Sequence, residues 1–281
     1  MYVVNLKGEK EPFSLQKVFR SAKRAGASPL LAKQIAKKIE KLVYPGITTS
    51  EIYKRVKQFL KKENKGAGLR FSLKEAMRKL GPSGFPFEKY VGEIFSVHGF
   101  EVKLNQIVKG KYATHEIDFV AKKDKLLYIA ECKFRHHRGE RIDLPITLAF
   151  WAKFQDLLEG KYLNRFTNCK IKPILITNAK FTRQAKRYAQ GVGIELLGWN
   201  FPKNKGLENM IEKELLYPIT ILPSFKGFLV DVFSSKFLML AKDILELDIK
   251  KFVQKEKLDI KKLEKLKQEA KILFDDSIVR K

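Results

Sequence analysis

The sequence predicts a multidomain α/β protein in which a central α/β core lies between two mainly helical segments. Apolar residues recur every three or four positions through the first 80 residues and again from about residue 216, and this is the period of a helix. The middle of the 281-residue chain instead alternates strand-like and helical runs. Breakers at Gly81-Pro82-Ser83-Gly84 and Tyr217-Pro218 separate these segments, so we expect domains at 1–82, 83–215 and 216–281.

The first segment begins with a short strand and continues as a small helical bundle. Residues 2–6 are strand-like and turn at Lys7-Gly8, after which Ser14 can cap a helix. The helices expected next span residues 29–43, a stretch starting near Thr48, and 71–80.

The middle segment is predicted to be a helix, three strands, a helix, a strand, a helix and a strand. Short polar connections separate the first three strands, as in an antiparallel meander. The expected ranges are 85–97, 101–108, 112–121, 126–134, 145–158, 172–178, 182–190 and 193–199. From Tyr217 the chain becomes helical again and ends in a Lys- and Glu-rich stretch at 245–274.

The charge balance points to a polyanionic partner. The chain has 57 Lys and Arg against 31 Asp and Glu, a net charge of +26. The electrostatic field of such a charge attracts nucleic acid. The alternative is a Lys-rich surface of the thermophilic kind, but that surface would carry balancing Glu. DNA is therefore the first partner to consider.

The composition also excludes several protein classes. A hydrophobic share of 44% is that of a globular chain. Cys132 and Cys169 are too few for a disulfide framework. We see no signal-peptide pattern and no apolar run of about 18 residues, so we expect a cytoplasmic protein that does not enter a membrane.

Two predicted strands carry acidic residues inside apolar surroundings. Glu-x-Lys begins at Glu63, Glu101, Glu131 and Glu269, but only Glu131 and Lys133 stand in an apolar strand. A period of two places both on one face and Cys132 on the other. The preceding strand places Glu116 and Asp118 on one face, and a hairpin would bring that face beside Glu131.

Such a cluster favours a divalent metal site. Gathered carboxylates repel one another, and a hard cation such as Mg²⁺ relieves the repulsion. A metal that activates water and neutralises phosphate charge, next to a lysine, is what phosphodiester hydrolysis needs. The alternative is a plain cross-strand ion pair on an exposed sheet face.

The arrangement resembles the PD-(D/E)xK nuclease superfamily in its Mrr-like restriction endonuclease branch. The resemblance rests on Asp118 followed by Glu131-Cys132-Lys133, and extends through Ile174–Asn178, Phe181-Thr182 and Gly193–Trp199. It implies that Asp118, Glu131 and the carbonyl of Cys132 bind Mg²⁺ or Mn²⁺ and that Lys133 is catalytic. It also implies active-site roles for Glu88 and Gln155; for Glu88 the alternative is an exposed helix charge.

Two basic groups could contact the DNA backbone, namely a loop after the catalytic strand and a helix near residue 185. The alternative for both is a solvated surface. Their members are Arg135, His136, His137 and Arg138 in the loop, and Arg183, Lys186 and Arg187 in the helix.

The first 80 residues resemble the ATP-cone, a regulatory nucleotide-binding module. The residues that carry this resemblance are Val4, Gly8, Glu11, Phe13, Lys17 and the run Ile47–Ile52. The resemblance implies that ATP or dATP is a regulatory ligand, with Val4, Glu11, Lys17, Thr49 and Tyr53 at the nucleotide.

One departure keeps a second interpretation of this module open. Asn5 and Leu6 stand where ATP-cones usually have two basic residues that reach the phosphates. A basic DNA-binding or dimerising module is therefore the alternative to nucleotide binding.

The whole sequence is interpreted as a metal-dependent DNA endonuclease regulated by ATP or dATP. The C-terminal helices are expected to serve packing or homodimer formation. The rival functions are a non-catalytic nucleic-acid-binding protein and a nucleotide-sensing regulator.

Overall fold

The structure is a computed structural model that describes residues 1–81 and 83–275, and its backbone divides into two compact units. Unit 1 contains residues 1–77, 217–229 and the described residues from Ala241 on. Unit 2 contains residues 78–216 and 230–240. The predicted three-domain division remains a prediction about which parts of the chain fold independently.

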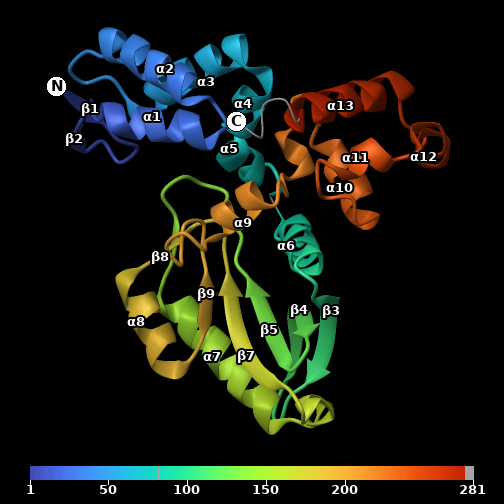
Figure 1. Cartoon of the computed structure of the whole chain (residues 1–281). Coiled ribbons are helices and arrows are strands. Elements are labelled where there is room, and N and C mark those ends of the chain that lie inside the picture. The colour runs from blue at the N-terminus through green and yellow to red at the C-terminus, as the bar shows by residue number, and fades with distance from the viewer. Residues whose placement is uncertain (82, 276–281) are drawn as a thin grey trace. The chain divides into compact units, whose positions relative to one another are not determined.

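Unit 1 begins with a β-hairpin and the helices that follow it (Figure 1). The antiparallel strands β1 and β2 are joined by a turn in which Gly8 has a φ of +79°. Ser14, Ser28 and Thr48 cap the next three helices through their side-chain oxygens. The elements are β1 Tyr2–Val4, β2 Lys10–Pro12, α1 Leu15–Arg24, α2 Pro29–Leu42, α3 Thr49–Glu63, α4 Lys65–Arg70 and α5 Leu73–Arg78.

The helix expected at 71–80 is present as α5, which is two residues shorter at each end. The short helix α4 before it was not predicted. Asn64 caps α4, but Gly66 and Gly68 inside it weaken the helical signal. Gly68 is required by packing, because a Cβ there would lie 2.8 Å from the Cα of Lys61.

The late segments of the chain complete unit 1. Arg70 is only 5% exposed, and its guanidinium donates to the carbonyl of Ala25 at 2.8 Å and to that of Leu273 at 2.7 Å. It thereby satisfies carbonyls at the ends of α1 and α13. Thr220 donates to the carbonyl of Ala76 at 2.8 Å. The late helices of unit 1 are α11 Asp243–Glu246, α12 Ile249–Glu256 and α13 Ile260–Leu273, whereas most of α10 Phe228–Ser235 lies in unit 2.

Unit 2 is built on a five-stranded sheet of order β3-β4-β5-β7-β9. The first three strands form the predicted antiparallel meander, and β7 and β9 continue the sheet in parallel with β5. A small parallel sheet of β6 and β8 was not predicted. The strands are β3 Glu101–Lys109, β4 Thr114–Lys123, β5 Leu126–Cys132, β6 Arg141–Ile142, β7 Lys170–Ile176, β8 Lys180–Phe181 and β9 Glu195–Leu197.

Helices cover both faces of this sheet (Figure 1). On one face, Phe154 and Leu157 of α7 pack against Leu127 and Ile129 of β5. On the other face, Phe95 of α6 contacts Phe119 and Tyr128. The helices are α6 Phe85–Val97, α7 Leu144–Glu159, α8 Arg183–Val192 and α9 Leu207–Lys213.

Residues 230–240 belong to unit 2 because α6 holds them. Lys89 is buried and donates to the carbonyl of Ser234 at 2.8 Å, and Glu93 accepts from the backbone N–H of Met239 at 3.1 Å. Among the described residues, no helix is both long enough and apolar enough to span a bilayer.

Candidate active site

The acidic residues singled out in the sequence lie where the C-terminal end of β5 runs beside the middle of β4. The register of the two strands pairs Phe119 with Ala130, so one further step places Asp118 opposite Glu131. Opposed residues of an antiparallel pair share a face. Asp118 and Glu131 therefore both lie on the face that α7 covers.

A short hydrogen bond joins the two strands at this point. Asp118 Oδ2 accepts from the backbone N–H of Cys132 at 2.6 Å. Asp118 is thus held beside the Glu131-Cys132-Lys133 run. The Cys132 side chain points away and is buried, and that burial, together with nearby carboxylates, raises the pKa of its thiol.

Glu131 is almost completely buried and is held between two lysines. Its Oε1 lies 2.6 Å from Nζ of Lys133, and its Oε2 lies 2.6 Å from Nζ of Lys153. Lys133 directly follows β5, and Lys153 comes from α7. A buried carboxylate needs such partners, because an unpaired buried charge is costly.

Lys133 stays cationic in this environment. Burial works to lower the pKa of its ammonium, but Glu131, which also accepts its hydrogen bond, and Asp118 outweigh burial and raise it. Near neutral pH the site therefore contains a fixed positive charge next to its carboxylates.

The carboxylates destabilise one another's charged forms. Burial and then Glu131 raise the pKa of Asp118 to about 6. Burial and then Asp118, Glu116 and Glu131 raise the pKa of Glu88 to about 7. Acidic groups whose pKa values are shifted in this way cluster at functional sites. Glu88, from the first turn of α6, thus shares one electrostatic environment with the strand acids.

The donor chemistry fits a hard divalent cation, although the side chains are not arranged around one. Within residues 1–81 and 83–275, no three His, Cys, Asp or Glu side chains are placed closely enough to hold a metal ion. Burial and the neighbouring carboxylates nevertheless raise the pKa values of Asp118 and Glu88, and a divalent cation nearby would favour their charged forms. The residues present therefore fit a hard divalent cation.

The segment that carries Lys133 is clamped onto β7 and the residues that follow it. Thr177 donates to the carbonyl of Lys133 at 2.6 Å. The Asn178 side chain accepts from the N–H of Arg135 at 2.7 Å and donates to its carbonyl at 2.8 Å. Both clamping residues are buried. These bonds fix the chain direction immediately after β5.

Sequence reasoning missed Lys153 and chose Gln155 on the same helix. Residues two apart lie about 200° apart around a helix, so the side of α7 that brings Lys153 to Glu131 does not carry Gln155. The sequence does contain a signal that singles out Lys153. It follows Phe150 by three positions and precedes Leu157 by four, so a lysine stands on the inward apolar stripe. The role of Gln155 stays a prediction.

The loop expected to contact DNA is shaped by its own hydrogen bonds. The backbone N–H of His137 donates to Glu140 Oε2 at 2.7 Å, and Gly139 adopts a φ of +90°. The rings of His136 and His137 lie 5.2 Å apart. On α8, Arg183 and Arg187 are exposed at i, i+4 spacing, whereas Lys186 lies 4.3 Å from the ring centroid of Phe201. DNA contact by these groups stays a prediction.

The five residues expected at a nucleotide come from adjoining parts of unit 1. A parallel bridge joins Val4 to Thr48, which precedes Thr49, and Glu11 lies 3.8 Å from Lys17. Tyr53 follows Thr49 by one helical turn, stacks on Phe71 at 4.8 Å, and donates to its carbonyl at 3.2 Å. The Tyr53 hydroxyl therefore already has a structural partner. Nucleotide contact by these residues is untested.

Comparisons with known proteins agree with this architecture. The model of the ATP cone domain matches residues 1–74, and that of the restriction endonuclease family matches residues 80–200. This chain belongs to the Mrr-like restriction endonuclease family. An ATP cone domain precedes its restriction endonuclease domain, which confirms the order expected from the sequence. The mixed α/β fold class is confirmed as well.

Two relatives extend the match without assigning a function. An uncharacterized protein of Archaeoglobus fulgidus is 40% identical over 132 residues, which are 47% of this chain and 71% of the relative. The crystal structure of a protein of unknown function is similar with a TM-score of 0.60 and 31% identity, covering 69% of this chain and all of that one. The restriction endonuclease domain indicates a nuclease that acts on DNA, and the ATP cone indicates regulation by a nucleotide.

Proposed function

We propose that this restriction endonuclease-like protein hydrolyses DNA phosphodiester bonds with Mg²⁺ or Mn²⁺. The observation that carries the proposal is the pairing of Asp118 with the Glu131-Cys132-Lys133 run on two adjoining strands, with Lys133 held on Glu131 at 2.6 Å. Asp118, Glu131 and the Cys132 carbonyl would hold the metal. A bound divalent cation would lower the pKa of a water molecule and neutralise charge on the phosphate.

The residues of the chain supply the remaining requirements of hydrolysis. The Lys133 ammonium stays protonated and can orient the attacking water or stabilise the negative charge that builds on phosphate oxygen. Glu88, whose pKa of about 7 lies near neutrality, can exchange a proton under working conditions. The net charge of +26 supports DNA as the substrate.

We propose further that ATP or dATP regulates this activity through residues 1–74. The ATP cone match supports this regulation, as do the bridge that brings Val4 to Thr48, next to Thr49, and the contact of Glu11 with Lys17. The chain has no GxxxxGK[ST] motif, so the nucleotide would regulate rather than drive hydrolysis.

The test is a panel of DNA substrates with and without metal. Plasmid, linear, single-stranded and branched DNA would be incubated with the protein in EDTA, Mg²⁺ or Mn²⁺, each with and without ATP. We expect cleavage with metal and none in EDTA, and a change in rate when ATP is added. Tight binding without cleavage of any substrate would instead favour a non-catalytic DNA-binding protein.

Lys153 provides a prediction about metal affinity. Its ammonium occupies Glu131 Oε2 and adds a positive charge to the region where a metal would bind. Lys153→Met is therefore expected to tighten Mn²⁺ binding about tenfold in calorimetry without DNA. Lys161→Met, an exposed lysine that follows the same helix, is the matched control. Weaker binding in Lys153→Met would mean that Lys153 supports the site instead of competing with the metal.

A further inference from the structure

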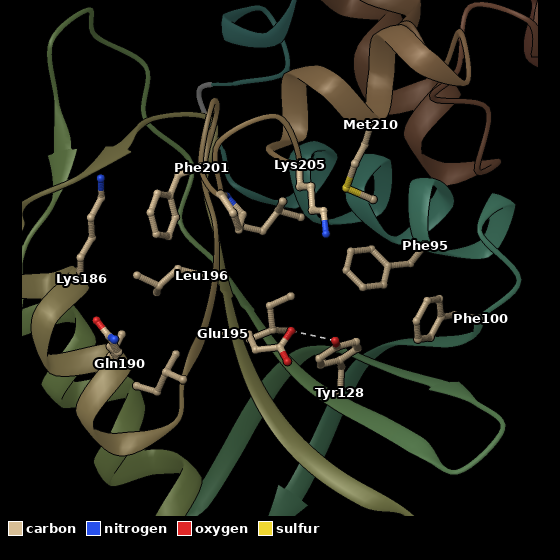
Figure 2. Close-up of a pocket in the computed structure, with 15 residues that line it drawn as sticks. Phe95, Phe100, Tyr128, Lys186, Gln190, Glu195, Leu196, Phe201, Lys205 and Met210 are labelled. Carbon is tan, nitrogen blue, oxygen red and sulfur yellow. Dashed lines mark hydrogen bonds between the residues drawn. The ribbon is translucent and has the colours of Figure 1, made fainter.

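A hollow of unit 2 lies away from the carboxylates of the candidate active site. It has a volume of about 680 Å³ and is lined by parts of α6, the sheet, α8 and the segment after β9 (Figure 2). Two residues of its floor share a face of the sheet with Ala130: Tyr128 lies two residues before Ala130 on β5, and Ile174 of β7 is paired with Ala130. Glu131, which is paired with Leu175, lies on the opposite face. The hollow is therefore separate from the candidate active site, and we call it the β9 pocket.

Aromatic rings form much of the wall of the β9 pocket. The rings of Phe95, Phe100 and Tyr128 lie 5.4 to 6.1 Å from one another and make one side. Phe201 lies apart from this group and contacts Phe181 at 6.2 Å. Flat rings on two sides suit a flat ligand, because aromatic rings bind planar groups by stacking.

The charged residues of the pocket determine which sign of charge a ligand should carry. The carboxylate of Glu195 accepts from the Tyr128 hydroxyl at 2.7 Å and is also paired with Lys172, so its negative charge is already matched. Burial and then Glu195 raise the pKa of Tyr128, so its phenol stays protonated and keeps donating.

Two lysines remain available to a ligand. Figure 2 shows Lys205 pointing into the pocket and Lys186 standing beside Phe201. Among the described residues, neither lysine forms an ion pair with an acidic side chain. Gln190 adds an amide that can both donate and accept hydrogen bonds. The pocket thus combines stacking surfaces, a small number of polar groups and an excess positive charge.

We propose that the β9 pocket binds a nucleotide, with the base among the aromatic rings and a phosphate at Lys186 and Lys205. The volume is in the usual range of ligand pockets. The bound nucleotide could come from two sources. One is a nucleotide of a bound DNA strand, and for this source the proposal rests on the proposed action on DNA. The other source is a free mononucleotide, which has the same base and phosphate.

The test uses the full-length protein in EDTA, so that no DNA is cleaved. The probes are the monophosphate of 2-aminopurine deoxyriboside and a single-stranded oligonucleotide with 2-aminopurine at one end, whose fluorescence falls when the base stacks. We expect quenching by wild type. Phe201→Ala and Lys205→Glu are each expected to weaken binding by roughly tenfold.

Lys203→Glu is the matched control for Lys205→Glu. Lys203 is exposed in the same loop, carries the same charge and does not line the pocket. We expect its binding to stay within about twofold of wild type. Because Lys205 is exposed, its variant tests the pocket even if Phe201→Ala disturbs the fold. If the nucleotide bound elsewhere, for example in the ATP cone, the two variants Lys205→Glu and Lys203→Glu would bind it equally well.

The two probes separate the sources of the nucleotide. Variant-sensitive quenching of the free monophosphate supports a mononucleotide, and the same pattern with the oligonucleotide alone supports a nucleotide of a DNA strand. Quenching that is absent, or equal in Lys205→Glu and Lys203→Glu, would overturn the proposal. The cleavage panel is scored separately, so a protein that binds here but cuts no DNA would contradict only the nuclease proposal.

Discussion

Lys133→Ala is expected to lower metal-dependent DNA cleavage by roughly 10²- to 10³-fold while DNA binding in EDTA stays nearly unchanged. Lys133 directly follows β5 and is paired with Glu131, and its raised pKa keeps it charged. The variant removes the cation that would face the reacting phosphate. DNA affinity depends on many lysines and arginines, so losing one of 57 basic residues should change it little.

Lys125→Ala is the control for this experiment. Lys125 is an exposed lysine of the β4–β5 turn, so its loss removes one positive charge from the same unit without touching the carboxylates. Initial cleavage rates and gel-shift affinities of wild type and both variants would be compared at one salt concentration. Cleavage by Lys133→Ala at the wild-type rate would refute the assignment of Lys133.

Asp118→Asn is expected to abolish cleavage and, in the absence of metal, to make the protein more stable at pH 8. Asparagine keeps an oxygen that can accept from the Cys132 N–H but carries no charge. The raised pKa of Asp118 means that folding opposes its ionisation, because burial and then Glu131 disfavour the carboxylate. The expected gain is about 1–3 kcal/mol in the free energy of unfolding.

The pH dependence of this gain follows from the direction of the pKa shift. Between the ordinary pKa of 3.8 and about 6, the folded state binds more protons at Asp118 than the unfolded state does. The contribution of Asp118 to stability therefore falls as the pH rises through this window. The difference between Asp118→Asn and wild type should be near zero at pH 4 and complete above pH 7.

Urea unfolding in EDTA at pH 4, 6 and 8 would measure this difference. Asp124→Asn is the matched control, since Asp124 is exposed in the β4–β5 turn and asparagine tolerates its φ of +52°. Mg²⁺ should stabilise the wild type and leave Asp118→Asn unchanged. A variant that is less stable than wild type at pH 8 would mean that Asp118 serves the fold rather than a metal site.

Periodicity predicted the elements that bury a continuous apolar face. The meander of β3, β4 and β5 and the helices α6, α7 and α8 lie close to their expected ranges. It failed where few residues carry the signal, as in the two-residue strands β6 and β8. It also failed at α4, where packing against Lys61 demands a glycine that weakens helix propensity.

The candidate site was also predicted only in part, because only some of its residues stand out in the sequence. Asp118, Glu131 and Lys133 stand out because charges inside apolar strands need partners. Lys153 stands in a helix among many lysines, and its contact with Glu131 spans 22 residues that sequence spacing does not relate. The bond from Arg70 to Leu273 spans 203 residues, so the joining of late helices to the first module could not be seen in local patterns.

The Arg70 bonds also bear on how the chain acquires its structure during synthesis. A chain emerges from the ribosome from its N-terminus, and domains generally fold as units in that order. Residues 1–77 leave the ribosome long before Leu273, so the Arg70 guanidinium must wait for one of its two carbonyl partners. Unit 2 can complete its sheet during that interval, since its strands end at Leu197. The first module to be made is therefore among the last to be finished.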